Sequence, residues 1–168
     1  MSTDNNCIFC NSKCDVHETP NHHRLNTYSC DYCGEYILSK RGLDAVHDST
    51  DPSRKFKIAC ILNERRLKGL GGIALSNKTD KVDKVCGYPQ VSVDDILDEF
   101  PKKASDFIIR ALLNLSRLVK LPFDRIELNL EPVGKYNVFS QEGEQADSFL
   151  RELDYQGWIS SSNDSNCW

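Results

Sequence analysis

The clearest pattern of apolar positions along the chain lies between residues 102 and 120. Apolar side chains recur there at intervals of three and four residues: Phe107, Ile108, Ala111, Leu112, Leu115, Leu118 and Val119. This spacing predicts an amphipathic helix over 102–120 whose wide apolar face lies at the centre of the core. A shorter helix is expected just before it, from a capping-box-like start at Ser92 to Glu99, because Phe100-Pro101 cannot continue a helix.

A second helix is predicted from Asp51-Pro52 to Lys68, where Gly69 ends it. One face of this helix is mostly apolar: Phe56, Ala59, Cys60, Asn63, Leu67 and Leu70. The opposite face carries a basic stripe made of Arg54, Lys57, Arg65 and Lys68. Two interpretations of the basic stripe stay open, an ordinary solvated helix face or a contact to a phosphate backbone or an acidic partner.

The remaining elements are shorter. Residues 25–29 and 36–38 are expected to be strands, and Ile126, Leu128 and Leu130 alternate with polar residues as in a half-buried strand. A last helix is predicted to begin after Ser140 and to end in a left-handed turn at Gly157, with Trp158-Ile159 starting a strand. The polar stretch at about 76–90 is expected to be a long flexible loop.

Composition places the chain among ordinary soluble proteins of one domain or two small ones. It has 168 residues, of which 39% are apolar and 27% are charged. No apolar run approaches the roughly 20 residues of a membrane span, and the N-terminal residues lack the features of a secretion signal. We therefore expect a cytoplasmic, reducing location without membrane contact. In that setting the eight cysteines favour metal binding over disulfides.

The net charge of −4 is unevenly distributed. Residues 51–86 carry nine lysines and arginines against four acidic residues, whereas residues 87–168 carry eight against fourteen. Any contact with nucleic acid is therefore expected in the middle segment, because phosphates must be neutralised by cations. The acidic C-terminal part argues against tight non-specific binding of nucleic acid by the whole chain.

Two Cys-x-x-Cys pairs are the strongest chemical signal. The knuckles Cys7-Ile8-Phe9-Cys10 and Cys30-Asp31-Tyr32-Cys33 each turn tightly enough to direct two thiolates at one centre. Gly34 suits the second turn, because a positive φ there lets backbone amides point at sulfur. This pattern predicts a structural tetrahedral zinc ion bound by Cys7, Cys10, Cys30 and Cys33.

Other residues near the knuckles offer alternative sets of zinc ligands. Cys14 could replace one thiolate, and a histidine from the loop between the knuckles (His17, His22 or His23) could complete a Cys3His site. None of these residues belongs to a paired knuckle, so the four-cysteine set is favoured. A catalytic zinc is disfavoured, since four thiolates leave no position open for water.

The two knuckles, continued by Gly34-Glu35-Tyr36-Ile37, resemble the zinc-ribbon openings of prokaryotic multidomain proteins. The stretch from Phe139-Ser140 to Gly157-Trp158-Ile159 looks like the winged-helix ending found in such proteins, where an effector domain of antiviral defence follows. The resemblance implies a fold that is mainly α with a small β part. Residues 1–40 would be a zinc-ribbon module, and residues 41–168 a helical, winged-helix-like domain.

No catalytic motif is present among those of zinc deaminases, metalloproteases, serine hydrolases or P-loop proteins, so we do not expect an enzyme. The leading hypothesis is a non-catalytic, zinc-binding adaptor or sensor module that recognises a macromolecule, either a protein or a second copy of the chain, in a defence system. The first alternative is a nucleic-acid-binding regulator that uses the basic stripe. The second is a fragment of a multidomain enzyme whose effector domain is missing.

Overall fold

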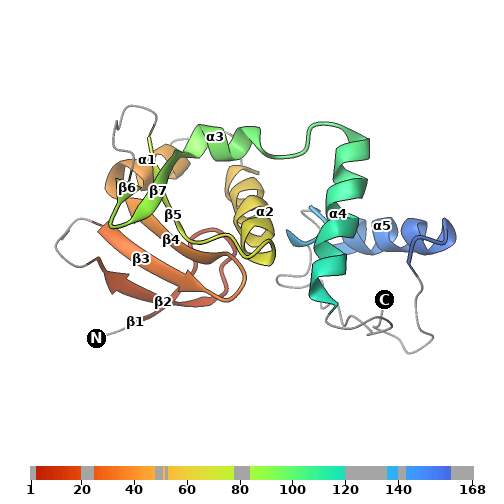
Figure 1. The fold of residues 1–168 in the computed structure, drawn as a ribbon, viewed down its shortest axis with the longest axis horizontal. Coiled ribbons are helices and arrows are strands. Elements are labelled where there is room, and N and C mark those ends of the chain that lie inside the picture. The colour runs from red at the N-terminus through yellow and green to blue at the C-terminus, as the bar shows by residue number, and fades with distance from the viewer. Residues whose placement is uncertain are drawn as a thin grey trace. The chain divides into compact units, whose positions relative to one another are not determined.

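The computed structural model describes residues 3–19, 25–47, 51, 53–77, 84–119, 136–139 and 143–159. The chain divides into two compact units, residues 1–100 and residues 101–168. Unit 1 contains a β-sheet with three helices, and the described elements of unit 2 are two helices, α4 and α5 (Figure 1). The predicted boundary after residue 40 falls inside unit 1, at the start of α1.

Unit 1 is built on a seven-stranded mixed sheet with the strand order β1-β2-β3-β4-β5-β7-β6. The strands are β1 (Thr3–Asn6), β2 (Lys13–Glu18), β3 (Leu25–Cys30), β4 (Gly34–Ser39), β5 (Ile73–Ser76), β6 (Lys84–Val85) and β7 (Tyr88–Ser92). Strands β1 to β4 form an antiparallel meander. Strand β5 then joins β4 in parallel, β7 joins β5 in parallel, and β6 closes the edge against β7.

Three helices cover the part of the sheet around β4, β5 and β7: α1 (Lys40–His47), α2 (Arg54–Leu67) and α3 (Val93–Asp98). Two parallel strands need a long connection, and α1 and α2 supply it between β4 and β5. Helix α1 packs on β4 and β5, α2 on β4 and α3, and α3 on β7. Figure 1 shows β1, β2 and β3 on the side of β4 that faces away from β5 and β7.

Helix α2 is more deeply buried than its sequence pattern predicts. Its middle residues, from Ile58 to Glu64, are buried on every side of the helix, and not only on the predicted apolar face. Leu70, which was assigned to that face, is 49% exposed. The helix therefore forms the core of unit 1, because the sheet and α3 both pack against it.

Unit 2 contains α4 (Ala104–Leu118), α5 (Gly143–Tyr155) and the short segment 136–139. Asn114 is fully buried on α4 and donates a hydrogen bond from Nδ2 to the Asn137 carbonyl, 3.2 Å away. The Arg110 guanidinium lies 5.1 Å from the centre of the Phe139 ring, which is a cation–π distance. These contacts attach segment 136–139 to α4.

The predicted fold class, mainly α with a small β part and a winged-helix-like body, is wrong. The N-terminal strands belong to a mixed sheet that also includes β5, β6 and β7. Strand β5 was missed because all four of its residues are buried, so it shows no alternation of apolar and polar positions. Strands β6 and β7 lie mostly within the stretch 76–90, which had been predicted as a loop.

The local predictions were more accurate. Strands β3 and β4 and helices α2, α3 and α4 lie where the patterns place them, and the Ser92 side chain caps α3 by accepting a hydrogen bond from the Asp95 amide at 3.0 Å. Gly69 ends α2 with a φ of +68°, and Gly157 follows α5 with a φ of +74°. Trp158 and Ile159, which were predicted to start a strand, form a bend after α5 instead, whereas the predicted strand at 126–130 and the Ser140 cap lie outside the described residues.

The contact between α1 and β5 depends on the absence of a side chain at Gly42. A Cβ atom there would lie 2.7 Å from the Leu75 carbonyl oxygen, which is backbone and cannot move alone. We expect Gly42→Ala to lower the free energy of unfolding by about 1–3 kcal/mol, as overpacking does. Urea unfolding measures the change. Gly71→Ala is the matched control, because a Cβ at Gly71 would meet nothing within 4 Å, and an equal effect of both substitutions would contradict the close contact.

Candidate metal centre

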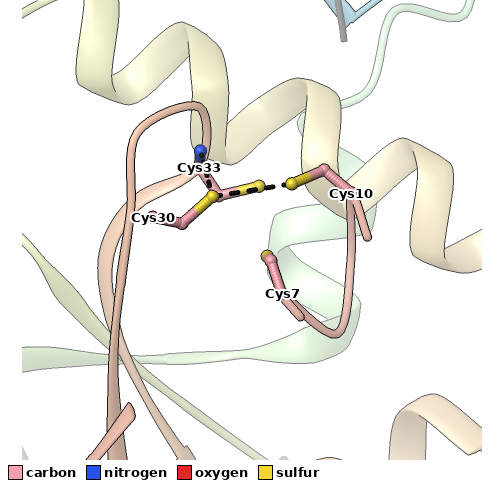
Figure 2. Close-up of side chains that lie close together, drawn as sticks. All are labelled: Cys7, Cys10, Cys30 and Cys33. Carbon is pink, nitrogen blue, oxygen red and sulfur yellow. Dashed lines mark hydrogen bonds between the residues drawn. The ribbon is translucent and has the colours of Figure 1, made fainter. Parts of the chain in front are cut away.

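The first knuckle lies in the turn between β1 and β2. The Cys7 amide donates a hydrogen bond to the Ser12 carbonyl at 2.7 Å, and the Asn11 amide donates one to the Cys7 carbonyl at 2.9 Å. Asn11 has a φ of +60°, a left-handed conformation that asparagine tolerates. These bonds close a tight loop that holds Cys7 and Cys10 on the same side of the turn (Figure 2).

The second knuckle joins β3 to β4. Cys30 ends β3, Gly34 begins β4, and the Cys33 amide donates a hydrogen bond to the Cys30 sulfur at 3.4 Å. The φ of Gly34 is +74°, as the knuckle turn was predicted to require. Pairing of β3 with β4 brings Cys30 directly opposite Gly34, so the sheet register positions this pair of thiols.

The structure brings the four predicted ligands together. The sulfur atoms of Cys7, Cys10, Cys30 and Cys33 all lie within 4.8 Å of one another, and Figure 2 shows the four side chains converging from the two knuckles. The Cys10 and Cys30 sulfurs lie 3.5 Å apart. Four sulfurs bound at ~2.3 Å around one tetrahedral zinc ion would lie ~3.8 Å apart. The cluster therefore has the dimensions of a site for one metal ion.

All four side chains are buried, with exposed fractions between 1% and 4%. In the cluster without an ion, hydrogen bonds from Cys10, then from Cys30 and Cys33, lower the pKa of Cys7, while the pKa of Cys33 is raised, first by its interaction with Cys10. The pKa of Cys10 is lowered as well, first by its hydrogen bond to Cys30, whereas the pKa of Cys30 is raised, so two thiolates are stabilised at the expense of the other two thiols. A divalent cation removes this competition, because it stabilises several thiolates at once.

The alternative ligands lie elsewhere. Cys14 is buried on β2 near the cluster, but it is not one of the four cysteines whose sulfurs meet. Burial, followed by the charges of Cys7 and Cys30, raises the pKa of Cys14 to about 11. His17 lies on β2 and is not part of the cluster either. His22 and His23 lie outside the described residues.

An aromatic group supports the first knuckle from the sheet side. Tyr36 on β4 is completely buried, and its hydroxyl lies 3.2 Å from the Cys7 sulfur. Its ring stacks on Tyr28 at 4.9 Å and lies 5.1 Å from the ring of Phe9, which belongs to the knuckle itself. Since a thiolate only accepts hydrogen bonds, the Tyr36 hydroxyl is the donor when Cys7 is deprotonated. Tyr36 therefore both packs the knuckle and orients one ligand.

Helix α2 holds the second knuckle. The Arg66 Nε donates a hydrogen bond to the Tyr32 carbonyl at 3.0 Å, and the Arg66 Nη2 donates one to the Asn63 Oδ1 at 3.1 Å. A Cβ added at Gly34 would lie 3.4 Å from the Arg66 Cβ, so the arginine side chain runs along the knuckle backbone. Neither Tyr36 nor Arg66 was predicted from sequence, because no local pattern links them to the cysteines.

Three of the four residues in the basic stripe have acidic partners. Arg54 pairs with Asp94 at 2.9 Å, Lys57 with Asp51 at 2.8 Å, and Lys68 with Glu64 at 2.7 Å. The fourth residue, Arg65, lines a pocket of about 270 Å³ next to the second knuckle. The basic stripe is therefore not a continuous surface of uncompensated positive charge.

Comparisons with protein-family models, with curated proteins and with solved structures found no match. In the part of the chain that the structure describes, no helix has the length and apolar character needed to cross a membrane.

The hydrogen bond from Tyr36 to Cys7 is expected to strengthen metal binding. Tyr36→Phe removes only the buried hydroxyl, and outer-shell donors of this kind affect metal affinity about tenfold or more. We expect weaker zinc binding with the fold retained, measured by competition with a chromophoric chelator. Tyr28→Phe is the control, because the Tyr28 hydroxyl interacts with Asn26. Equal zinc affinity in the wild type and Tyr36→Phe would exclude this role for the hydroxyl.

Proposed function

We propose that this chain is a non-catalytic recognition module whose two N-terminal knuckles are held by a structural zinc ion. The observation that carries the proposal is the cluster of four buried cysteine sulfurs within 4.8 Å. Four thiolates complete a tetrahedral shell, so no position is open for a water molecule or a substrate. A set of four sulfur ligands favours zinc over calcium or magnesium, which prefer oxygen. Because such a site needs reduced cysteines, we place the module in the cytoplasm.

The metal has a structural task that the fold makes specific. The knuckles lie at the same end of the β1-β2 and β3-β4 hairpins, and the ion would join the two turns. The second knuckle is also bonded to α2 through Arg66. A bound ion therefore stabilises the edge of the sheet and its attachment to the core helix.

A protein, or a second copy of this chain, is the partner that we favour. Ile109 and Leu113 lie one turn apart on α4 and are 55% and 46% exposed. Tyr155, the last residue of α5, and Trp158, in the bend that follows, are 86% and 62% exposed. Exposed aliphatic and aromatic side chains of this size are typical of protein contacts. They support recognition by unit 2, while the zinc ion stabilises unit 1.

Nucleic acid is the alternative partner. It would use the basic stripe, of which Arg54, Lys57 and Lys68 are already paired with carboxylates. Breaking these pairs to neutralise phosphates would cost part of the binding free energy. The further hypotheses, a role in a prokaryotic defence system or a place in a larger enzyme, rest on the resemblance of the knuckles and of the C-terminal stretch alone.

The zinc assignment predicts how the metal content responds to single substitutions. The wild type should bind one equivalent of zinc per chain, and Cys33→Ser should lose most of it, because three thiolates hold the ion much less tightly. Elemental analysis of the purified proteins measures both values. Cys60→Ser is the control, since Cys60 is a buried cysteine of α2 outside the cluster. A Cys33→Ser protein that keeps one equivalent would rule out the four-cysteine site.

The partner assignment predicts self-association through α4. We expect sedimentation velocity to show an oligomer that dissociates on dilution, and we expect Ile109→Lys with Leu113→Lys to abolish it. Ser105→Lys with Ser116→Lys adds the same charge at exposed polar positions of the same helix and should leave association unchanged.

A titration with random duplex and single-stranded nucleic acid provides the opposing test. Binding that falls steeply with salt, and that disappears when Arg54, Lys57, Arg65 and Lys68 are all changed to Ala, would replace the protein partner with nucleic acid. A monomer at every concentration would likewise remove the second copy as the partner.

A further inference from the structure

A fifth cysteine lies beside the metal centre and is not needed to bind the ion. Cys14 on β2 is only 4% exposed, and the sheet register places it directly opposite Cys30 on β3. Side chains of directly opposed residues on neighbouring strands project from the same face of a sheet. Because the Cys30 side chain points into the cluster, the Cys14 thiol lies on the cluster side of β2.

The hydrogen-bond pattern shows which kind of pair these two cysteines form. The Thr19 amide donates to the Leu25 carbonyl at 2.9 Å, so Thr19 and Leu25 form a hydrogen-bonded pair at one end of the ladder. Hydrogen-bonded and non-hydrogen-bonded pairs alternate along an antiparallel ladder. The register runs without interruption from Glu18 opposite Asn26 to Cys14 opposite Cys30. Counting along it makes Cys14 and Cys30 a non-hydrogen-bonded pair.

This pair type has the spacing of a disulfide. The Cα atoms of a non-hydrogen-bonded pair lie ~4.5 Å apart, closer than those of a hydrogen-bonded pair. Disulfides span Cα separations of about 4.4–6.8 Å. The backbone of β2 and β3 therefore needs little movement to let the sulfurs of Cys14 and Cys30 bond.

Metal binding favours Cys14 over the other cysteines as the disulfide partner of Cys30. When an ion is bound, Cys7, Cys10 and Cys33 are each occupied as ligands, whereas Cys14 is the thiol next to the centre that the ion does not hold. The two other cysteines described outside the cluster lie on α2, at Cys60, and in the β6-β7 turn, at Cys86. Cys14 is thus the thiol best placed to react with an oxidised Cys30.

We propose that Cys14 and Cys30 are an oxidative modification site, at which a hydroperoxide forms a cross-strand disulfide and thereby releases the metal ion. The inference rests on the proposed four-cysteine metal site. It adds a response to peroxide to a centre whose other role is structural.

The reaction has two steps. The Cys30 sulfur attacks one oxygen of hydrogen peroxide, an S–O bond forms as the O–O bond breaks, and the departing hydroxide takes up a proton to become water. The Cys14 sulfur then attacks the Cys30 sulfur, the S–S bond forms as the S–O bond breaks, and the hydroxyl group leaves as water with the Cys14 proton. Two thiols are oxidised by two electrons, and one peroxide is reduced to two waters. Cys30 no longer supplies a thiolate, so three ligands remain and the ion dissociates.

The experiment treats the zinc-loaded full chain with hydrogen peroxide. A chromophoric chelator follows zinc release, and peptide mapping without reduction identifies the disulfides. We expect the Cys14–Cys30 disulfide to form together with zinc release, and a thiol reductant with added zinc to restore the centre. Cys14→Ser should bind one equivalent of zinc before oxidation and release it severalfold more slowly. Cys60→Ser, the matched control, should behave as the wild type does.

Several results would overturn the proposal. Zinc release from Cys14→Ser at the wild-type rate would show that Cys14 takes no part. A disulfide mapped to Cys30–Cys33 or Cys7–Cys10 would show that the knuckles close on themselves. Loss of zinc from Cys14→Ser before oxidation, repeated in Cys14→Ala, would make Cys14 a ligand.

Failure of the metal site gives a different result from failure of the disulfide. If the wild type binds no zinc, the proposed function fails, but peptide mapping after oxidation of the metal-free chain still measures the cross-strand pair. Formation of the Cys14–Cys30 disulfide there would retain the oxidation site without the metal. Its absence in both the loaded and the metal-free chain would exclude the site altogether.

Discussion

Four thiols cannot all lose their protons in a buried space unless a cation balances their charge. This electrostatic constraint governs the N-terminal half of unit 1, where the sulfurs of both knuckles lie within 4.8 Å of one another and are almost completely buried. Hydrogen bonding among the four thiols lowers the pKa values of Cys7 and Cys10 and raises those of Cys30 and Cys33. With an ion, the same closeness becomes favourable, because each thiolate contributes to one coordination shell. The hairpins that carry the knuckles are therefore coupled to metal binding.

The centre is also connected to the rest of unit 1. On the sheet side, the Tyr36 hydroxyl contacts the Cys7 sulfur, and its ring packs between Tyr28 and Phe9. On the helix side, Arg66 donates to the Tyr32 carbonyl inside the second knuckle. The metal site is thus connected to both the sheet and the helices of unit 1. Loss of the ion is therefore expected to weaken the packing of α2.

Charge pairing narrows the functional interpretation. A stripe of four cations on one helix face suggests a surface for phosphates, yet Arg54 is paired with Asp94 from α3 and Lys68 with the buried Glu64. Exposed apolar side chains lie instead in unit 2, where Ile109 and Leu113 share a face of α4. Together these features favour a module that contacts protein while its metal maintains the first unit.

Features that depend on neighbours within a few residues could be predicted from the sequence alone. Cys-x-x-Cys spacing identified the four cysteines that cluster, Ser92 marked the start of α3, and Gly69 marked the end of α2. These features are local, because a turn or a cap is made by residues that are close in the chain.

Contacts between distant segments could not be predicted in this way and are seen only in the folded chain. The parallel pairing of β4 with β5 depends on a four-residue strand that is buried throughout and carries no periodic signal. The pair of Arg54 with Asp94 joins residues forty positions apart. The position of Cys14 opposite Cys30 follows from the register of two strands, and a shift of one residue would turn one of these side chains to the other face of the sheet. Such contacts are set by how elements pack, which the composition of each element alone does not specify.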